Sequence, residues 1–424
     1  MLFGGRLQPA EIGVNEDGRI VRIAKSIPTG RRWEFGDRVI VPAATDLHVH
    51  LREPGGPHDV EDALSGTEAA AVGGVTAVGD MPNTDPPITT RLRFEEKATR
   101  LSGRLAVDVV AFAALRPETS VLDLGSIAGS WKLYLSPTTG MEEGVPRAEV
   151  RALLASATAG RIPVTVHAET AALFRHDLVP RNSWDWSTCR PPESERVAVS
   201  SLLPAPEGIR LNIAHVTEAE TAEAVRAAGH LHEVTPHHLL LSAREDRDGR
   251  WKTNPPLRPE ADRGRLWEAF AAGRIPVVAS DHAPHAVDAK TGAFEKAPSG
   301  VPGVETMLPV LLEKVRSAEL GLDVLQSAAC DRPARWFGLD HGRLAPGHRA
   351  NFLVVDFSKR STIRGDRLRT RCGWTPFEGW PAIFPVAHFR DGVPLVTDGS
   401  FVGAHAGRVV RPEYAREPDP PTDR

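Results

Sequence analysis

The chain has 424 residues, a length that allows one large domain with a smaller one or two to three ordinary domains. Its content of 41% hydrophobic and 25% charged residues is typical of a soluble globular protein. A net charge of −4 with interspersed signs leaves no basic surface for nucleic acid and no polybasic patch for a membrane. The sequence contains no apolar run of about 18 residues, the length that spans a bilayer, and its first residues do not form a secretory signal.

The three cysteines are Cys189, Cys330 and Cys372, which lie far apart without a Cys-x-x-Cys motif. Their odd number argues against a disulfide framework. We therefore expect reduced thiols that serve as small buried residues, and a cytoplasmic location for the protein.

Residues 1–40 form the first predicted unit. They include EIGVNEDGRIVRIAK, which predicts two short strands joined by an Asp-Gly turn. We expect this hairpin to belong to a small β domain whose other half lies near the C-terminus.

Residues 41–340 predict a different architecture, because short β-branched runs alternate with segments of helical period, such as 147–161 and 261–274. The eight strand-like runs span residues 39–50, 74–82, 106–114, 130–136, 162–169, 210–216, 230–238 and 275–285. Continuous apolar strands that alternate with helices indicate a parallel sheet covered by helices. Eight such units predict an α/β fold, the (β/α)₈ TIM barrel.

Residues 341–410 contain short strands with glycine turns and no helical period, in HGRLAPGHRANFLVVDF and AHFRDGVPLVTDG. We expect them to pair with residues 1–40 in one small composite β domain beside the barrel. Residues 411–424, which include REPDPPTDR, predict a disordered tail.

Polar residues end several of the predicted barrel strands, where the active site of a (β/α)₈ barrel lies. They are His48 and His50 on the first strand, Lys132 on the fourth, His167 on the fifth, His215 on the sixth and Asp281 on the eighth. Residues two apart on a strand share a face, so the His-x-His spacing directs both imidazoles into the barrel mouth.

Each of these residues also has an ordinary structural explanation. A strand-end histidine is usually a satisfied structural residue, a lysine often extends its charge to the surface, and a strand-end aspartate often caps the next helix. Coincidence is a poor explanation for six such residues at the same end of five strands. The pattern therefore favours a metal site.

Several longer motifs make the pattern specific. They are DLHVHLREPGG, GGVTAVGDMPNTDPP, KLYLSPTTG, HAE, AHV, EVTPHHLLLS, NPPLR, ASDHAPH, GVPGVETMLP and CGWTPFEG. Together they resemble the dihydroorotases of the cyclic amidohydrolase superfamily, from about residue 39 to residue 380. His-x-His alone would indicate only the superfamily, whereas HLREPG with MPNT and SDHAPH is much more specific.

The resemblance implies two Zn²⁺ ions per chain. His48, His50 and Asp281 would hold the first ion, and His167 and His215 the second. Lys132, carbamylated by carbon dioxide, would bridge them, and burial would lower its pKa to permit that reaction. Some relatives use an aspartate shortly after this lysine, but LYLSPTTG contains no carboxylate. Ala214 replaces the cysteine of other relatives, so we expect no additional metal.

The reaction implied by the resemblance is the reversible cyclisation of N-carbamoyl-L-aspartate to L-dihydroorotate and water, in pyrimidine biosynthesis. The metals would activate water and polarise the ring carbonyl, and Asp281 would act as general base and then general acid. The substrate carboxylate would bind Arg52, which continues the period-two series after His50. By the family pattern Asn83 and His285 would join Arg52, and Asn254 would contact the ring edge.

Other features leave alternatives open. Thr138 and Thr139 predict either a mobile loop that closes over substrate or a plain turn. Glu53 either orients a histidine or pairs with a nearby cation.

Two rival functions are a sister cyclic amidohydrolase and a non-catalytic scaffold. An allantoinase, hydantoinase or dihydropyrimidinase would share the metals but lack the carboxylate site at Arg52 and Asn83. A scaffold would be expected to have lost metal ligands, which this chain retains. A homodimer and association with aspartate carbamoyltransferase are the macromolecular partners that we considered.

Overall fold

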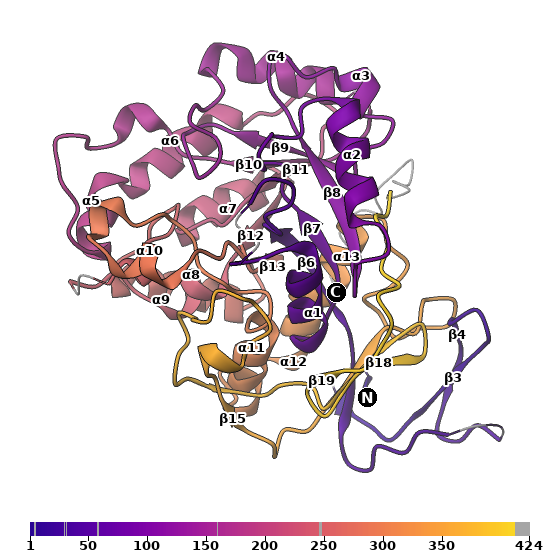
Figure 1. Ribbon diagram of the computed structural model, residues 1–424. Helices are drawn as coiled ribbons and strands as arrows, with labels where there is room; N and C mark the ends of the chain where they lie inside the picture. The colour runs from indigo at the N-terminus through magenta and orange to yellow at the C-terminus, as the bar shows by residue number, and fades with distance from the viewer. Residues whose placement is uncertain are drawn as a thin grey trace.

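Eight parallel strands form the central barrel of the computed structural model (Figure 1). Their bounds are β6 (Ala44–Val49), β7 (Val75–Asp80), β8 (Asp108–Ala114), β9 (Ser130–Tyr134), β10 (Val164–His167), β11 (Leu211–Ile213), β12 (Leu231–Val234) and β13 (Val277–Val278). The amide of His50 donates to the carbonyl of His282 at 2.8 Å, which brings the last strand back to the first. Strands such as β7, buried at every residue, require cover on both faces. The predicted (β/α)₈ barrel is therefore confirmed.

The structure describes residues 1–3, 6–28, 30, 32–56, 59–158, 160–245 and 248–411. The predicted disordered tail, 411–424, lies outside this part of the chain except for Arg411.

Helices surround the barrel and connect its strands (Figure 1). The longer ones are α1 (Ala63–Val72), α2 (Arg91–Leu101), α4 (Arg147–Thr158), α6 (Pro192–Leu202), α7 (Ala219–Ala227), α9 (Glu260–Ala271) and α11 (Met307–Arg316). In α4 the buried residues Val150, Leu153, Leu154 and Ala157 follow helical spacing, so one apolar stripe packs on the sheet. Helices α4 and α9 overlap the predicted helical segments 147–161 and 261–274 and end at Thr158 and Ala271.

Shorter helical segments fill the connections. The α-helical ones are α3 (Val121–Leu124), α5 (Ser183–Cys189), α8 (Pro236–Leu240), α10 (Val287–Thr291), α12 (Leu322–Gln326) and α13 (Arg332–Trp336). The others are η1 (Ala171–Leu173), η2 (Gly249–Trp251), η3 (Phe294–Lys296), the π-helical η4 (Ser327–Asp331) and η5 (Gly365–Arg367).

The predicted first barrel strand, residues 39–50, is two strands in the structure. β5 (Val39–Pro42) pairs with β14 (Phe352–Val355) in a five-stranded antiparallel sheet, whereas β6 belongs to the barrel. The other strands of the small sheet are β17 (Ala387–Arg390), β18 (Val393–Thr397) and β19 (Ser400–Phe401). One continuous apolar run thus leads from the small sheet into the barrel.

The N-terminal hairpin is formed by β3 (Glu11–Val14) and β4 (Ile20–Ala24), as predicted. The amide of Ile20 donates to the carbonyl of His348 at 2.8 Å, so the two ends of the chain meet. They share an apolar cluster that includes Ile20, Phe352 and Phe389. Two further two-stranded sheets are β1 (Leu2–Phe3) with β2 (Arg6–Leu7) and β15 (Ser361–Thr362) with β16 (Pro381–Ala382). The exact bounds of a separate β domain stay a prediction.

α1 consists largely of small residues because it is enclosed on both sides. It contacts β7 of the barrel and β18 and β19 of the small sheet, and eight of its ten residues are buried. At its N-terminus, Asp62 accepts a hydrogen bond from the amide of Ser65 at 2.8 Å. At its C-terminal end Gly74 has φ of +87°, and a Cβ there would lie 2.8 Å from Leu353.

All three cysteines are free and buried. Within the described residues, no helix is long and apolar enough to cross a membrane.

Candidate metal centre and active site

A cavity of about 390 Å³, its open mouth included, lies at the C-terminal ends of the barrel strands. The residues that line it are His48, His50, Arg52, Asn83, Lys132, Tyr134, Thr138, Thr139, His167, His215, Asn254, Asp281, Ala283, Ser299 and Gly300. The structure therefore brings the predicted metal ligands and most of the predicted substrate-binding residues into one site. Its size suits a small molecule.

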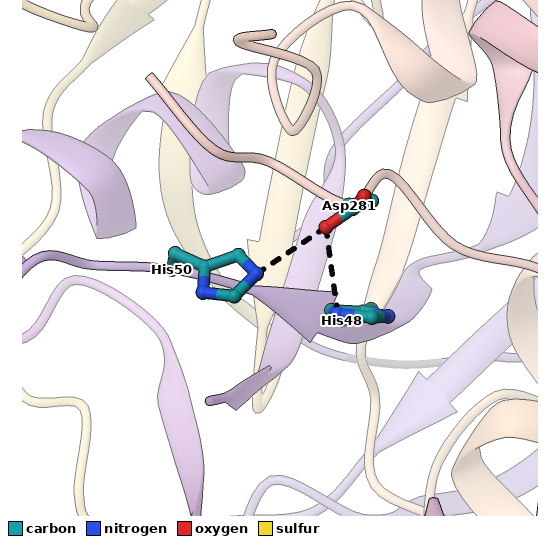
Figure 2. A group of neighbouring side chains, drawn as sticks. All are labelled: His48, His50 and Asp281. Carbon is teal, nitrogen blue, oxygen red and sulfur yellow. Dashed lines mark ion pairs between the residues drawn. The ribbon is translucent and has the colours of Figure 1, made fainter. Parts of the chain in front are cut away.

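His48, His50 and Asp281 form a compact group that could hold a metal ion (Figure 2). Oδ1 of Asp281 lies 3.4 Å from Nε2 of His48 and 3.3 Å from Nε2 of His50. Burial holds the pKa of both histidines well below 6.5, so the imidazoles are neutral, the form that binds metal.

The other ring nitrogen of each of these two histidines, Nδ1, forms a hydrogen bond. Nδ1 of His48 donates to Oε1 of Glu233 at 2.6 Å, and Nδ1 of His50 donates to Oδ1 of Asn83 at 2.8 Å. Asn83 in turn donates from Nδ2 to the carbonyl of Thr139 at 2.7 Å. These bonds fix the tautomers that leave both Nε2 atoms available to a metal.

His167 and His215 form a second group on the neighbouring strand ends. Nδ1 of His167 lies 3.0 Å from Nε2 of His215, and Nε2 of His167 donates to Glu169 at 3.0 Å. The buried Arg190 forms an ion pair with Glu169. Burial tends to raise the pKa of Glu169, but Arg190 and the bond from His167 hold it below its ordinary value. The facing nitrogens of the two histidines are therefore positioned for one shared cation.

Lys132 lies between the two groups, on β9. It is 1% exposed, and its Nζ is 3.3 Å from Nε2 of His48. Burial lowers the pKa of Lys132 from 10.5 to about 8. A neutral amine is therefore accessible near physiological pH, as addition of carbon dioxide requires.

The backbone is strained at three residues of the site. Arg52, His215 and Asp281 have φ of 59°, 39° and 45° in the left-handed region, which non-glycine residues rarely adopt. Such strain costs about 1–3 kcal/mol per residue and persists where the surrounding structure imposes it. The surrounding structure therefore imposes these backbone conformations at three residues whose side chains line the cavity.

The guanidinium of Arg52 extends to the loop after β13. It donates to the carbonyl oxygen of Pro284 at 3.2 and 3.1 Å and lies 3.2 Å from Nε2 of His285. Burial lowers the pKa of Arg52 from 12.5 to about 10. Among the described residues, no carboxylate forms an ion pair with this guanidinium. Its positive charge is therefore available to bind an anionic ligand.

The remaining predicted residues are placed as follows. His285 contacts Arg52 and lies 2.9 Å from the carbonyl of Ser299, and it is not among the described residues that line the cavity. Asn254 accepts from Nε1 of Trp186 at 3.2 Å. Glu53 pairs with Arg104 and not with a histidine.

The loop that contains Thr138 and Thr139 closes one side of the cavity. Amide and carbonyl groups of Thr138 and Met141 bond reciprocally at 2.9 Å. The hydroxyl of Thr139 donates to the carbonyl of Ser299 at 3.3 Å. The loop therefore bridges two sides of the mouth, and its predicted movement stays a prediction.

Sequence reasoning missed Tyr134, Glu169, Arg190 and Glu233. Glu233 is a buried carboxylate in a barrel strand and contacts Nδ1 of His48, and an acidic residue in such a strand is a signal that could have been used. Arg190 lies at the end of α5 and offered no comparable signal.

A family model for the amidohydrolase family matches residues 39–376. The chain belongs to the amidohydrolase family. Two curated relatives of this amidohydrolase are named dihydroorotase. The protein of Halobacterium salinarum is 39% identical over 384 residues, covering 88% of this chain and 90% of the relative. The protein of Methanosarcina mazei is 35% identical over 444 residues, covering 96% and 94%.

The fold of this amidohydrolase is also found in solved structures. An L-hydantoinase (dihydropyrimidinase) from Arthrobacter aurescens matches with a TM-score of 0.89 at 26% identity, covering 95% of this chain and 96% of that one. The sequence relatives and this structural neighbour thus carry names from the two groups of cyclic amidohydrolases that the sequence left open.

The donor set of this amidohydrolase fits a metal centre. Four neutral imidazoles, one aspartate and one lysine converge at the cavity, and hydrogen bonds orient three of the imidazoles from behind. Nδ1 of His215 is buried without a partner among the described residues. Nitrogen and carboxylate ligands of this kind suit Zn²⁺.

Proposed function

We propose that the protein is a dihydroorotase, which interconverts N-carbamoyl-L-aspartate and L-dihydroorotate. The observation that carries this proposal is the guanidinium of Arg52, which faces the cavity beside the metal-binding group without a carboxylate partner among the described residues. Dihydroorotate has a ring carboxylate, whereas hydantoin and allantoin rings do not. The names of the curated relatives support the same assignment.

His48, His50 and Asp281 would hold one Zn²⁺ ion and His167 and His215 a second, with carbamylated Lys132 between them. When bound, the metals supply Lewis acidity and lower the pKa of a water molecule in the site. The buried position of Lys132 beside His48 supports its role as the bridging group.

Asp281 provides proton transfer in this mechanism. Its Oδ1 faces the imidazoles of His48 and His50, and the side chain is 12% exposed, which keeps it in contact with the cavity. The carboxylate accepts a proton from the attacking water and then passes it to the ring nitrogen as the amide bond breaks. In the biosynthetic direction the same proton moves back.

Arg52 would hold the substrate carboxylate through its planar guanidinium, which offers two parallel donors. His285 touches Arg52 and fixes its position at the mouth. Asn83 bonds to both His50 and the loop of Thr139, so it would couple the metal group to the substrate side of the cavity. Asn254 would contact the ring edge.

The experiment is a parallel assay of dihydroorotate, hydantoin and allantoin with protein whose zinc content has been measured. We expect about two zinc ions per chain and a kcat/KM for dihydroorotate at least roughly 100-fold above that for either uncharged ring. Preference for hydantoin would favour the sister enzyme. Zinc-free protein without activity would favour the scaffold. A cytoplasmic location, a homodimer and association with aspartate carbamoyltransferase stay predictions.

A further inference from the structure

Tyr134 lines the cavity and has no role in the proposed reaction. It ends β9, two residues after Lys132, and both side chains face the inside of the barrel. Its ring packs in an apolar cluster with Ala114 and Met141, and its centroid lies 6.1 Å from that of His167. These contacts hold the ring in place.

The hydroxyl of Tyr134 is buried without a partner. The residue is 3% exposed, and no group among the described residues forms a hydrogen bond with Oη. A buried hydroxyl without a partner is destabilising, and most buried polar groups in native proteins have one. Phenylalanine would fill the same space without this cost. Packing therefore explains the ring of Tyr134 but not its hydroxyl.

The position of Tyr134 in the barrel indicates which part of the substrate it meets. Tyr134 pairs in register with His167 on β10, whereas Arg52 follows β6, the third strand from β9 in sheet order. A flat ring whose carboxylate binds Arg52 would extend across the cavity that Arg52 and Tyr134 both line. Its amide would then lie between the metal-binding histidines and the hydroxyl of Tyr134.

We propose that Tyr134 is a catalytic residue that donates a hydrogen bond to the carbonyl oxygen of the ring amide that is broken. The inference rests on the proposed function, because it takes that ring amide as the substrate. Negative charge develops on this oxygen when water attacks, so the bond strengthens in the transition state. The phenol keeps its proton throughout, since burial raises the pKa of Tyr134 above its ordinary value of about 10.

The test is Tyr134→Phe, which removes one oxygen atom and keeps the ring. We expect kcat and kcat/KM for dihydroorotate to fall together by roughly 100-fold, the usual effect of removing one donor to an oxyanion. KM, zinc content and the melting temperature should stay as in the parent protein. The matched control is Met141→Leu, which changes the packing around the ring but leaves the hydroxyl, and should keep kcat within about threefold of the parent.

Two results would overturn the assignment of Tyr134. The first is a kcat for Tyr134→Phe within about threefold of the parent, whatever happens to KM. The second is loss of zinc from the variant, which would place the hydroxyl in the metal site. Failure of the proposed function is a separate outcome, because the parent would then prefer hydantoin, and the same comparison of kcat would be made with that ring.

Discussion

His167 donates from Nε2 to a carboxylate oxygen of Glu169 at 3.0 Å, two residues along the same strand end. The bond places the proton of His167 on Nε2 and leaves Nδ1 facing His215 at 3.0 Å. Arg190 pairs with Glu169 and lies over the ring of Phe174 at 4.2 Å. A buried cation, a carboxylate and an imidazole thus form a chain that ends at the second predicted metal position.

Glu169→Gln should weaken one metal position and spare the other. The amide can donate to Nε2 and favour the wrong tautomer of His167, so we expect the affinity for the more weakly held zinc to fall roughly 10–100-fold. Titration with a zinc indicator measures both affinities. Glu193→Gln, an exposed site on α6, is the matched control. Equal zinc binding in both variants would contradict the role of Glu169.

Arg52→Gln should act on substrate binding more than on the metals. The variant loses the charged guanidinium but keeps a hydrogen-bond donor. KM for dihydroorotate should therefore rise roughly 100-fold, with little change in zinc content. Turnover of an uncharged hydantoin, where measurable, should change by less than about threefold. A parallel loss for both rings would show that Arg52 shapes the site and does not select the carboxylate. Arg93→Gln on α2 is a suitable control variant.

Lys132→Ala should abolish both the activity and the bridge between the metals. Native mass spectrometry of the parent protein should show the mass of one added carbon dioxide, and this adduct should be absent from the variant. We expect kcat to fall at least roughly 1,000-fold, because the variant lacks the amine beside His48 that would form the bridge. Full activity of parent protein that lacks the adduct would exclude carbamylated Lys132.

Removal of zinc should destabilise the fold around the cavity. Chelation leaves four imidazoles and Asp281 without the cations that they would hold, so the melting temperature should fall. Added zinc should restore both the melting temperature and dihydroorotase activity. Restoration of only one of them would separate a structural ion from a catalytic one.

Much of the site could be predicted because its residues interrupt apolar strands. His48, His50 and His167 stand out in runs of small and β-branched residues, and the barrel rule then places them at one mouth. Glu169 and Arg190 could not be paired this way, since the contact joins a strand end to the end of α5 across 21 residues. Such contacts depend on how the segment between a strand and the next helix folds back onto the strand end.

The fold shows the same limit. The eight strands followed from their composition, but the division of residues 39–50 between two sheets did not, because only Ala43 lies between β5 and β6. Only the partner of each strand separates them, and β14 lies about 300 residues further along the chain. The missed hydroxyl of Tyr134 has a similar cause, because a tyrosine in an apolar strand suits the core as well as a site.

Glu305 should make stability depend on pH at a distance from the metal groups. Its carboxylate is 5% exposed and accepts from the amide of Arg369 at 2.7 Å. Burial raises the pKa of Glu305 from 4.5 to about 8. Between these values the folded state keeps a proton that the unfolded state has lost. The free energy of unfolding therefore falls as pH rises through this window, by at most about 1.4 kcal/mol per pH unit.

Glu305→Gln should remove this contribution, because the neutral amide keeps an oxygen for Arg369 and does not titrate. We expect the loss of unfolding free energy between about pH 5 and about pH 8 to be smaller in the variant than in the parent protein. Urea titrations at each pH measure the difference. The exposed Glu295→Gln should behave like the parent, since its side chain faces solvent in both forms. If all three proteins lose stability equally, Glu305 is ionised in the folded state and its burial has been offset by its hydrogen bond.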